Sequence, residues 1–266
     1  MRGIGTLFYD KSKQDHFFYD DVHLSQIVRH FEFNNSLRIL VFDAISRIEI
    51  SVRTRFIYEL ATEYGPFPFK KENFVFKTES AWVKSYEKLL EDISHSKEEY
   101  IRHYRDTYQE EIPPIWIMGE LMTFGEISNW FDNFLPSYIK KKISLFYGIQ
   151  PIVMSSWLRT LSCIRNIAAH HDRLWNKILP FEVMIPNKTH DDRFKGLFVA
   201  ADKSSNNSKR VYNALIVIQY LLNQIGLDEG SNQFLKGVQS LMEKYHIENY
   251  KRMGIPIPLK QIIDVI

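Results

Sequence analysis

The longest periodic stretch of the sequence repeats its apolar residues every three or four positions. Residues 36–64 read "SLRILVFDAISRIEISVRTRFIYELATEY", and the repeat runs through Leu37, Leu40, Val41, Ala44, Ile45, Ile48, Val52 and Phe56. A helix turns about 100° per residue, so these side chains share one face, whereas a strand requires alternation. The pattern predicts a long amphipathic helix. Asn34, Asn35 or Ser36 is expected to cap its start, and Gly65-Pro66 to end it.

The opposite face of this predicted helix is basic. It carries Arg47, Arg53 and Arg55 together with Glu49, and the spacing of four between Glu49 and Arg53 allows an ion pair. Two interpretations stay open. The face is either solvated or lines a polar cleft.

Shorter helical patterns occupy most of the remaining chain, and no run of β alternation stands out. The sequence therefore predicts an all-α protein, one domain over residues 1–266. Thr123 and Glu126 have the spacing of a capping box at the start of a helix. A long polar loop, with a small hairpin, is expected at about residues 175–207. Further helices are expected to follow Thr78, to follow Ser96 as far as Pro113-Pro114, to end near Gly148, and to cover about 151–173, 208–225 and 229–246.

Composition favours a cytoplasmic protein without membrane contact. Cys163 is the only cysteine, so no disulfide can form within the chain. The N-terminal residues lack the apolar segment of a signal peptide, and the run from Ala214 to Leu222 is too short to span a bilayer. The net charge of +2 gives no support for nucleic-acid binding by the chain as a whole. A polyanion site would be local, at Lys140, Lys141 and Lys142 or between Arg159 and Lys177.

The segment "CIRNIAAHHDRLWN", residues 163–176, concentrates nitrogen-bearing side chains on a predicted helix. Trp157, Leu161, Ile164, Ala168 and Trp175 form its expected buried stripe, and His171 lies on that stripe, where it could be a core histidine. Asn166, His170 and Arg173 form a second stripe that is wholly polar. Asn is a poor helix former in mid-helix, so this stripe is unusual for a plain surface helix.

The residue types of the polar stripe suit phosphodiester cleavage in RNA. Imidazole can take and give a proton near neutral pH, and guanidinium can hold a phosphate and offset its developing charge. The 2′-hydroxyl of RNA is the nucleophile, and no metal is required. Arg165 and His170 point about 140° apart on a regular helix. For both to reach one phosphate, the helix must distort near its C-terminal end or a second subunit must contribute.

Two other interpretations of this segment remain. A structural polar network would use the same side chains. A metal site fits less well, because adjacent histidines diverge by about 100° whereas zinc helices place them four apart. We therefore expect neither metal nor cofactor.

Five pieces of the sequence, which together cover most of the chain, have a recognisable order: "LRILVFDAISRIEISVRTRF" (37–56), "YGPFPF" (64–69), "IPPIWIMGELMTFGEISNWF" (112–131), "SWLRTLSCIRNIAAHHDRLWN" (156–176) and "MGIPIP" (253–258). Within the fourth piece, "RNIAAHH" fits the Arg-x4-6-His signature of HEPN domains, with a polar residue after the Arg. In these pieces and their order, the sequence resembles the Abi family of bacterial abortive-infection proteins, the AbiD/AbiF-like group.

The resemblance implies a HEPN-like helical bundle with additional N- and C-terminal helices, frequently dimeric, in which the signature helices of two copies meet at a cleft. Proteins of this kind are commonly metal-independent endoribonuclease toxins, and here the antitoxin would be a small structured RNA. The implied catalytic residues are Arg165, Asn166 and His170, with His171 adjoining. Members often have more sequence, including a Tyr-rich segment, before the first matching helix, where this chain has about 35 residues.

We expect RNA contacts at Arg47, Arg53, Arg159, Arg173, Lys140, Lys141 and Lys142. Two rival functions remain open. The protein could bind a structured RNA without cutting it and act by sequestration. It could also be a helical adaptor whose sticky surface is the aromatic connector Pro66–Phe76.

Overall fold

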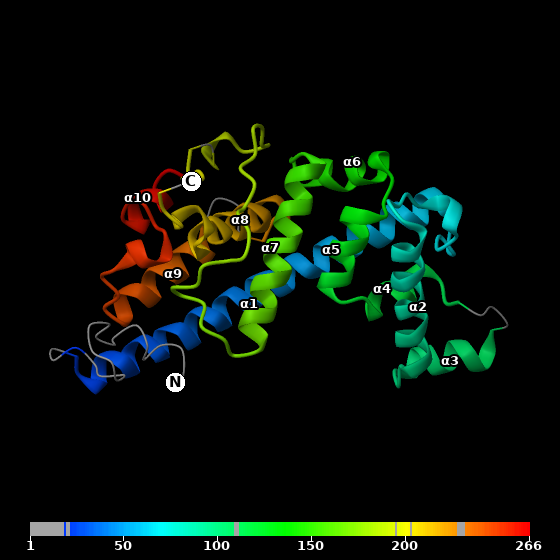
Figure 1. Ribbon diagram of the computed structural model, residues 1–266, viewed down its shortest axis with the longest axis horizontal. Coiled ribbons are helices and arrows are strands. Elements are labelled where there is room, and N and C mark those ends of the chain that lie inside the picture. The colour runs from blue at the N-terminus through cyan, green and yellow to red at the C-terminus, as the bar shows by residue number, and fades with distance from the viewer. Residues whose placement is uncertain (1–18, 20–21, 109–111, 195, 203, 228–231) are drawn as a thin grey trace. The chain divides into compact units, whose positions relative to one another are not determined.

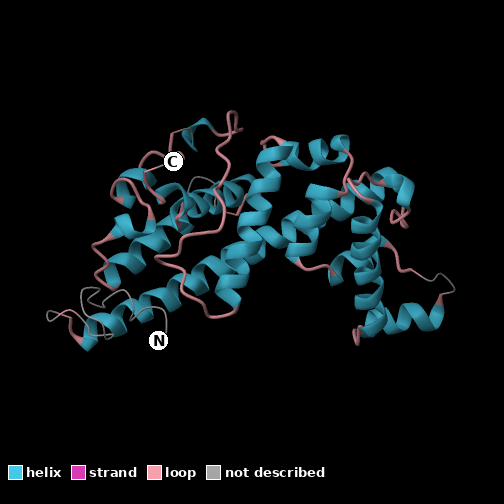
Figure 2. Ribbon diagram, viewed as in Figure 1, coloured by secondary structure: helices cyan, strands magenta, loops and turns pink. Residues whose placement is uncertain are grey.

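The computed structural model describes residues 19, 22–108, 112–194, 196–202, 204–227 and 232–266 (Figure 1). Within these residues the regular structure consists of α-helices and short 3₁₀ turns, with no strand (Figure 2). Two isolated bridges, Ile178 with Arg210 and Asp202 with Ser205, are the described β pairing. The predicted all-α class is confirmed, and the loop that follows the signature segment contains the short Asp202–Ser205 bridge in place of a regular hairpin.

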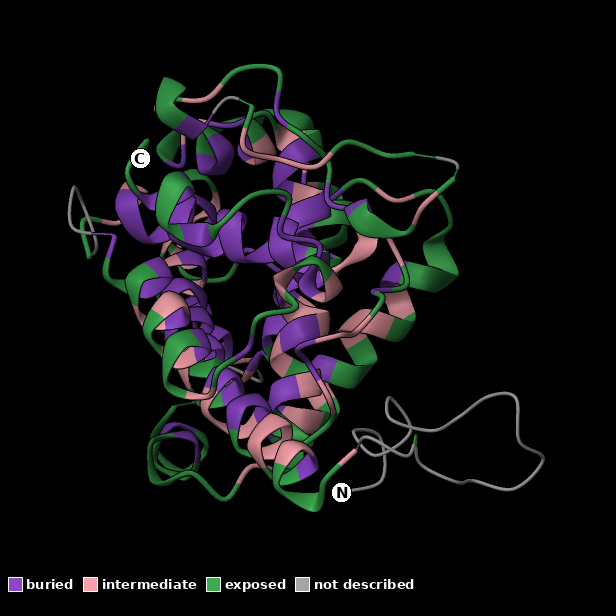
Figure 3. Ribbon diagram, turned by 90° about the vertical axis from the view of Figure 1, so that its left-hand side faces the viewer, coloured by how far each residue is buried: buried purple, intermediate pink, exposed green. Residues whose placement is uncertain are grey.

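The chain divides into two compact units, which we describe separately. The motif unit contains the residues up to Ile48 and those from Cys163 to Ile266, and the middle unit contains Glu49–Ser162. The boundaries fall inside two helices, α1 (Leu24–Tyr64) and α7 (Pro151–Ala169). Buried and exposed residues fall on different faces of several helices in both units (Figure 3).

Helix α1 begins well before the predicted start, so the prediction that Asn34, Asn35 or Ser36 caps it was wrong. Nothing between Leu24 and these residues breaks a helix, and Ile27 and Phe33 continue the buried stripe at helical spacing. The stripe itself is confirmed, with Leu40 half-buried and its other members buried. Gly65 ends the helix in a left-handed conformation with φ 76°.

In the motif unit, α8 (Val211–Gln224) is buried from Val211 to Asn223 and packs against α9 (Gln233–Lys244). Both predicted C-terminal helices are present. The predicted start of the second, at residue 229, lies outside the described residues. Helix α10 (Leu259–Ile263) packs against α9 and follows the "MGIPIP" segment.

The middle unit contains α2 (Glu79–His95), α3 (Glu99–Thr107), α4 (Ile115–Leu121), α5 (Phe124–Asn133) and α6 (Ser137–Phe146). The capping box of α5 is confirmed, because the Thr123 hydroxyl accepts from the Glu126 N–H at 3.2 Å and the Glu126 carboxylate accepts from the Thr123 N–H at 2.8 Å. Phe69 and Phe74 pack edge-on against Trp130, each 5.1 Å from it between ring centroids. The aromatic connector therefore puts these two rings into the core.

Helix α7 contains the first part of residues 163–176, which we call the signature segment, and ends at Ala169, short of the predicted end at Arg173. Its predicted stripe is confirmed, since Trp157, Leu161, Ile164 and Ala168 are all buried. Among the described helices, none combines the length and the apolar character needed to cross a membrane.

Candidate functional site

Helix α7 ends in a Schellman turn built around the two adjacent histidines. The N–H of His170 still donates to the carbonyl of Asn166, at 2.9 Å, as in a regular helix. The next two N–H groups do not follow the helical spacing of four residues. That of His171 donates to the carbonyl of Ala168 at 3.4 Å, and that of Asp172 donates to the carbonyl of Ile167 at 3.0 Å. His171 is left-handed, with φ 59°, at the position where most such turns place Gly. A left-handed residue with a Cβ costs about 1–2 kcal/mol, so other contacts must hold this turn.

Arg38 of α1 supplies that support. Its Nη1 donates to the carbonyl of Ala168 at 2.9 Å and lies 3.0 Å from Nδ1 of His171, and its Nη2 donates to Oδ1 of Asn35 at 2.8 Å. Arg38 is only 8% exposed. Because a guanidinium donates and never accepts, Nδ1 of His171 is the acceptor, and the ring proton lies on Nε2. Arg38 thus has two roles: it supplies a donor to the carbonyl of Ala168 at the end of the helix, and it selects the tautomer of His171.

Asn34, also on α1, holds the chain that leaves the turn. Its Oδ1 accepts from the N–H groups of Leu174, at 2.8 Å, and Trp175, at 3.3 Å. Trp175 packs beside His30, with 5.1 Å between ring centroids, and meets the edge of Phe33. Asn34, one of the side chains predicted to cap α1, therefore holds the segment that follows α7 instead.

The predicted catalytic residues lie near the surface of the motif unit. Asn166, His170 and His171 are exposed, so His171 is not a core histidine. Arg165 is half-buried, and its guanidinium carbon lies 5.8 Å from the centroid of the Phe42 ring, which belongs to α1. This cation–π contact places the guanidinium against α1.

Three further predicted RNA contacts remain reachable at the surface. Arg47 is exposed and pairs with Asp43 at 3.1 Å, one turn earlier on α1. Arg173 is half-buried, and burial lowers its pKa while the neighbouring Asp172 raises it. Arg159, in the middle unit, is exposed.

The other predicted RNA contacts, all in the middle unit, differ in whether their positive group already bonds to an oxygen of the protein. Arg53 is 16% exposed and pairs with Glu49 at 2.9 Å, the ion pair that the spacing of four predicted. Lys142 pairs with Glu63 at 2.8 Å. Lys140 donates to the backbone carbonyl of Asp132 at 2.6 Å, whereas Lys141 is simply exposed.

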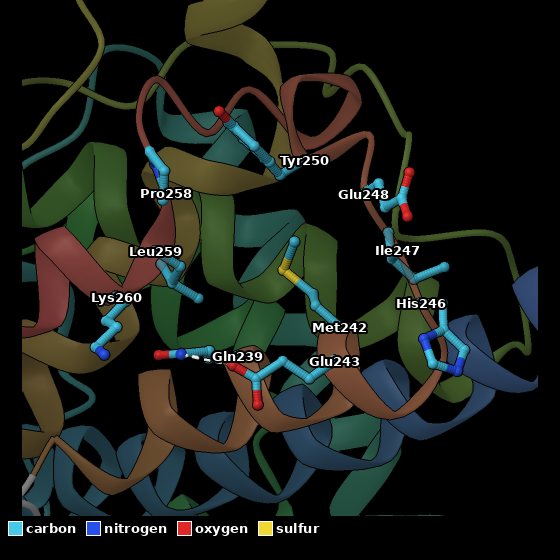
Figure 4. A pocket seen from close by; sticks show the side chains of 10 residues that line it. All are labelled: Gln239, Met242, Glu243, His246, Ile247, Glu248, Tyr250, Pro258, Leu259 and Lys260. Carbon is cyan, nitrogen blue, oxygen red and sulfur yellow. Dashed lines mark hydrogen bonds between the residues drawn. The ribbon is translucent and has the colours of Figure 1, made fainter.

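A separate cavity of about 500 Å³ lies between α9 and the segment that leads to α10 (Figure 4). Met242, Ile247 and Leu259 give it an apolar lining, and its charged groups are of both signs. His246 lies at its edge and is left-handed, with φ 49°, in a second turn of the same kind as that at His171. The mixed charges give this cavity no preference for a polyanion.

Sequence reasoning missed Asn34, Asn35 and Arg38 as parts of the site. The available signal was their character: two asparagines and an arginine within one turn of an otherwise apolar helical pattern. Asn favours helix ends over helix interiors, which is why these residues looked like a cap.

Within the described residues, no three His, Cys, Asp or Glu side chains are grouped so that they could hold a metal ion.

Comparison with known proteins supports one family assignment. A family model described as "Abi-like protein" matches residues 6–176, which include α1 and end just after the Asn34–Trp175 contact. Neither the curated proteins nor the solved structures contain a match. The match covers more than half of the chain, and it includes the turn at the end of α7 and the α1 residues that hold it. The chain therefore belongs to the Abi-like protein family, which associates it with abortive infection, a defence against phage.

Proposed function

We propose that this protein is a metal-independent endoribonuclease of the HEPN type. It would act as the toxin of an abortive-infection system and be restrained by a small structured RNA. The observation that carries the proposal is the end of α7, where an accessible His170 lies in a turn held from α1 by Arg38 and Arg165 lies just before that turn on the helix. The fit of "RNIAAHH" to the HEPN signature supports the same reading.

In the proposed reaction, His170 takes the proton of a 2′-hydroxyl. The 2′-oxygen then attacks phosphorus, the P–O5′ bond breaks, and the proton returns to the leaving 5′-oxygen from an imidazole. The products are a 2′,3′-cyclic phosphate and a free 5′-hydroxyl. Arg165 offsets the charge that builds on the phosphate oxygens, and Asn166 positions the phosphate. Nε2–H of His171, the tautomer that Arg38 selects, can donate to a phosphate oxygen.

The geometry of α7 favours a site shared by two copies. The backbone bond from His170 to Asn166 is still helical, so Arg165 and His170 keep their divergence of about 140°. The helix departs from regular geometry only at His171. A homodimer would let the arginine of one copy and the histidine of the other meet at one phosphate.

RNA contacts are also proposed for Arg47, Arg159 and Lys141, whose side chains are exposed, and for Arg173, which is half-buried. Arg53, Lys140 and Lys142 contribute less, because nearby oxygens already hold their positive groups.

The direct test is cleavage of end-labelled RNA by the purified protein with a chelator present. We expect cleavage that leaves 2′,3′-cyclic phosphate ends, and a fall of about 100-fold or more in Arg165→Ala and in His170→Ala. Arg102→Ala with His103→Ala changes an exposed Arg and His on α3 and should leave the rate unchanged. A metal requirement, or full activity in the Arg165→Ala, His170→Ala double variant, would refute the mechanism.

A second candidate is RNA sequestration without cleavage. It is favoured by the contacts of Arg38, which give His171 a structural role in the turn that needs no chemistry. Here the purified protein would carry intact RNA, detected by its absorbance ratio at 260 and 280 nm, and labelled RNA would stay whole. The adaptor interpretation stays open, because Phe69 and Phe74 of the aromatic connector are buried whereas Phe67 and Val75 are exposed.

A further inference from the structure

Two cavities of the middle unit share one wall, made by Asn129 and Asn133 of α5. The first, of about 210 Å³, extends to Arg159 and to Ser155 and Ser162 of α7. The second, of about 480 Å³, extends to Lys77 and Lys84. Together they form a polar path over the surface of this unit with cations at both ends.

The shared wall is held in place by its own hydrogen bonds. Nδ2 of Asn133 donates to Oδ1 of Asn129 at 2.8 Å, one helical turn away, and Nδ2 of Asn129 lies 3.5 Å from the hydroxyl of Ser85 on α2. Both asparagines are exposed. Oδ1 of Asn133 and the second proton of each amide therefore face no partner in this chain of bonds. These amide groups can bond to a neutral polar group of a ligand while the hydrogen bonds between Asn133, Asn129 and Ser85 stay intact.

Positive charge around the second cavity is poorly compensated. In the part of the chain that the structure describes, Lys77 and Lys84 form no ion pair, whereas Lys88 and Lys142 of the same unit are paired with Glu126 and Glu63. Burial lowers the pKa of Lys140, Asp132 raises it, and the nearby charge of Lys77 lowers it further. The one acid among the residues that line the two cavities is Asp132, beside Lys140.

This pattern fits a ligand that alternates anionic and neutral polar groups. Phosphates of a nucleic-acid strand would meet the cations, and sugar hydroxyls would meet the amide wall between them. Phe134 lines the second cavity but is only 3% exposed, so no aromatic ring is offered for base stacking. Binding would follow the backbone and depend little on sequence.

We propose that a single strand of RNA binds across these two cavities, with phosphates at Arg159 and at Lys77 and Lys84 and a 2′-hydroxyl against Asn133. The proposal rests on the proposed function only for the choice of RNA as ligand. It assigns Lys77, Lys84, Asn129 and Asn133 to RNA binding, in the middle unit, whereas Arg165 and His170 belong to the motif unit.

The test is fluorescence anisotropy with a labelled single-stranded RNA and the full-length His170→Ala variant, which prevents cleavage during titration. Adding Lys77→Glu and Lys84→Glu should weaken binding at least tenfold and reduce the slope of log K against log salt by about 1.4, since each single-strand phosphate contact contributes about 0.7. The matched control is Lys70→Glu with Lys97→Glu, which makes the same charge change at exposed lysines outside the cavities. It should change Kd less than threefold.

The amide wall is tested with DNA of the same sequence. RNA should bind more tightly than DNA, and Asn133→Ala should remove that difference while leaving DNA binding unchanged. If the control substitutions at Lys70 and Lys97 weaken RNA binding as much as those at Lys77 and Lys84, the proposal is overturned. If the protein binds RNA and DNA with equal affinity, the choice of RNA as the ligand is overturned. A wild-type protein that binds RNA through Lys77 and Lys84 but never cuts it refutes only the nuclease. If the protein cuts RNA but Lys77→Glu and Lys84→Glu leave its affinity for RNA unchanged, only the proposal of this second site is refuted.

Discussion

At the scale of single residues, His171 is the most informative position in the molecule. Glycine would satisfy the left-handed turn after α7 without strain, yet the chain has an imidazole there. The ring is held at Nδ1 by Arg38, which is buried and whose other bonds close the end of the same helix. Strain at a histidine beside a candidate site favours a role for the imidazole itself.

Two substitutions at His171 separate turn geometry from chemistry. We expect His171→Gly to change the free energy of unfolding by less than about 1 kcal/mol, because relief of the left-handed strain offsets the lost Arg38 bond. His171→Val keeps a Cβ and adds β-branching, so it should destabilise by about 1–3 kcal/mol. Urea unfolding measures both. If the imidazole contacts RNA, cleavage falls in the stable Gly variant; unchanged cleavage there would leave His171 a purely structural role.

His30, against Trp175, should make stability depend on pH. Burial lowers its pKa below the ordinary 6.5, opposed by a bond to the Gln26 carbonyl, and the charges of Arg252 and Arg29 lower it further. Below pH 6.5 the unfolded chain takes up a proton that the folded chain resists. Stability is therefore full above that pH and falls as the pH drops toward the folded pKa.

The measurement is the Tm of wild type and of His30→Gln from about pH 7.5 to about pH 5.5. The wild type should lose more Tm over this range than the variant. His23→Gln changes an exposed histidine near the start of the same helix and should follow the wild type. Parallel curves for wild type and His30→Gln would contradict the assignment.

At the scale of elements, the early turns of α1 act as a clamp for the segment that follows α7. Asn34 holds the backbone of Leu174 and Trp175, and Arg38 holds Ala168 and His171. These contacts join residues more than 100 positions apart in the chain. The conformation of the segment around His171 therefore depends on contacts with residues of α1.

The clamp is tested by Asn34→Leu, which keeps the side-chain volume and removes the acceptor. Two buried N–H groups would lose their partner, so we expect a loss of about 1–3 kcal/mol in unfolding free energy. Cleavage should fall as well, because the segment after His171 loses its anchor. Glu32→Ala, at an exposed position on the same helix, should stay within about 0.5 kcal/mol of wild type. A loss no larger than that of Glu32→Ala would show that the Asn34 bonds do not hold the segment.

At the scale of the whole molecule, the chain divides into two compact units. The prediction of a single domain over residues 1–266 stays a prediction. The proposed catalytic residues lie in one unit and the proposed RNA path in the other.

A shared active site makes a specific prediction for mixed dimers. Arg165→Ala and His170→Ala should each be inactive alone. Co-expressed with different tags and purified as the mixed species, they retain one Arg165 and one His170 on different copies. Recovery of part of the wild-type rate is expected if these residues meet across the dimer. No recovery in a verified mixed dimer would mean that both residues must come from one chain.

Much of the fold was predictable because its signals are local. The apolar stripe of α1, the capping box at Thr123 and the stop at Gly65 all involve residues a few positions apart, and each is confirmed. The errors concern the predicted cap of α1, at Asn34, Asn35 or Ser36, and the end of α7. There, local preference for a cap or a continuing helix gave way to contacts with distant residues.

The sequence alone determined the helices and the chemistry of the candidate site, because helical periodicity and side-chain type are written in neighbouring residues. It showed an arginine, an asparagine and a histidine within one short segment. Only the tertiary structure decided how that segment is held. The left-handed turn at His171 and its tautomer depend on a hydrogen bond to Arg38, 133 residues away. Such a pairing exists only once burial brings α1 and the end of α7 together.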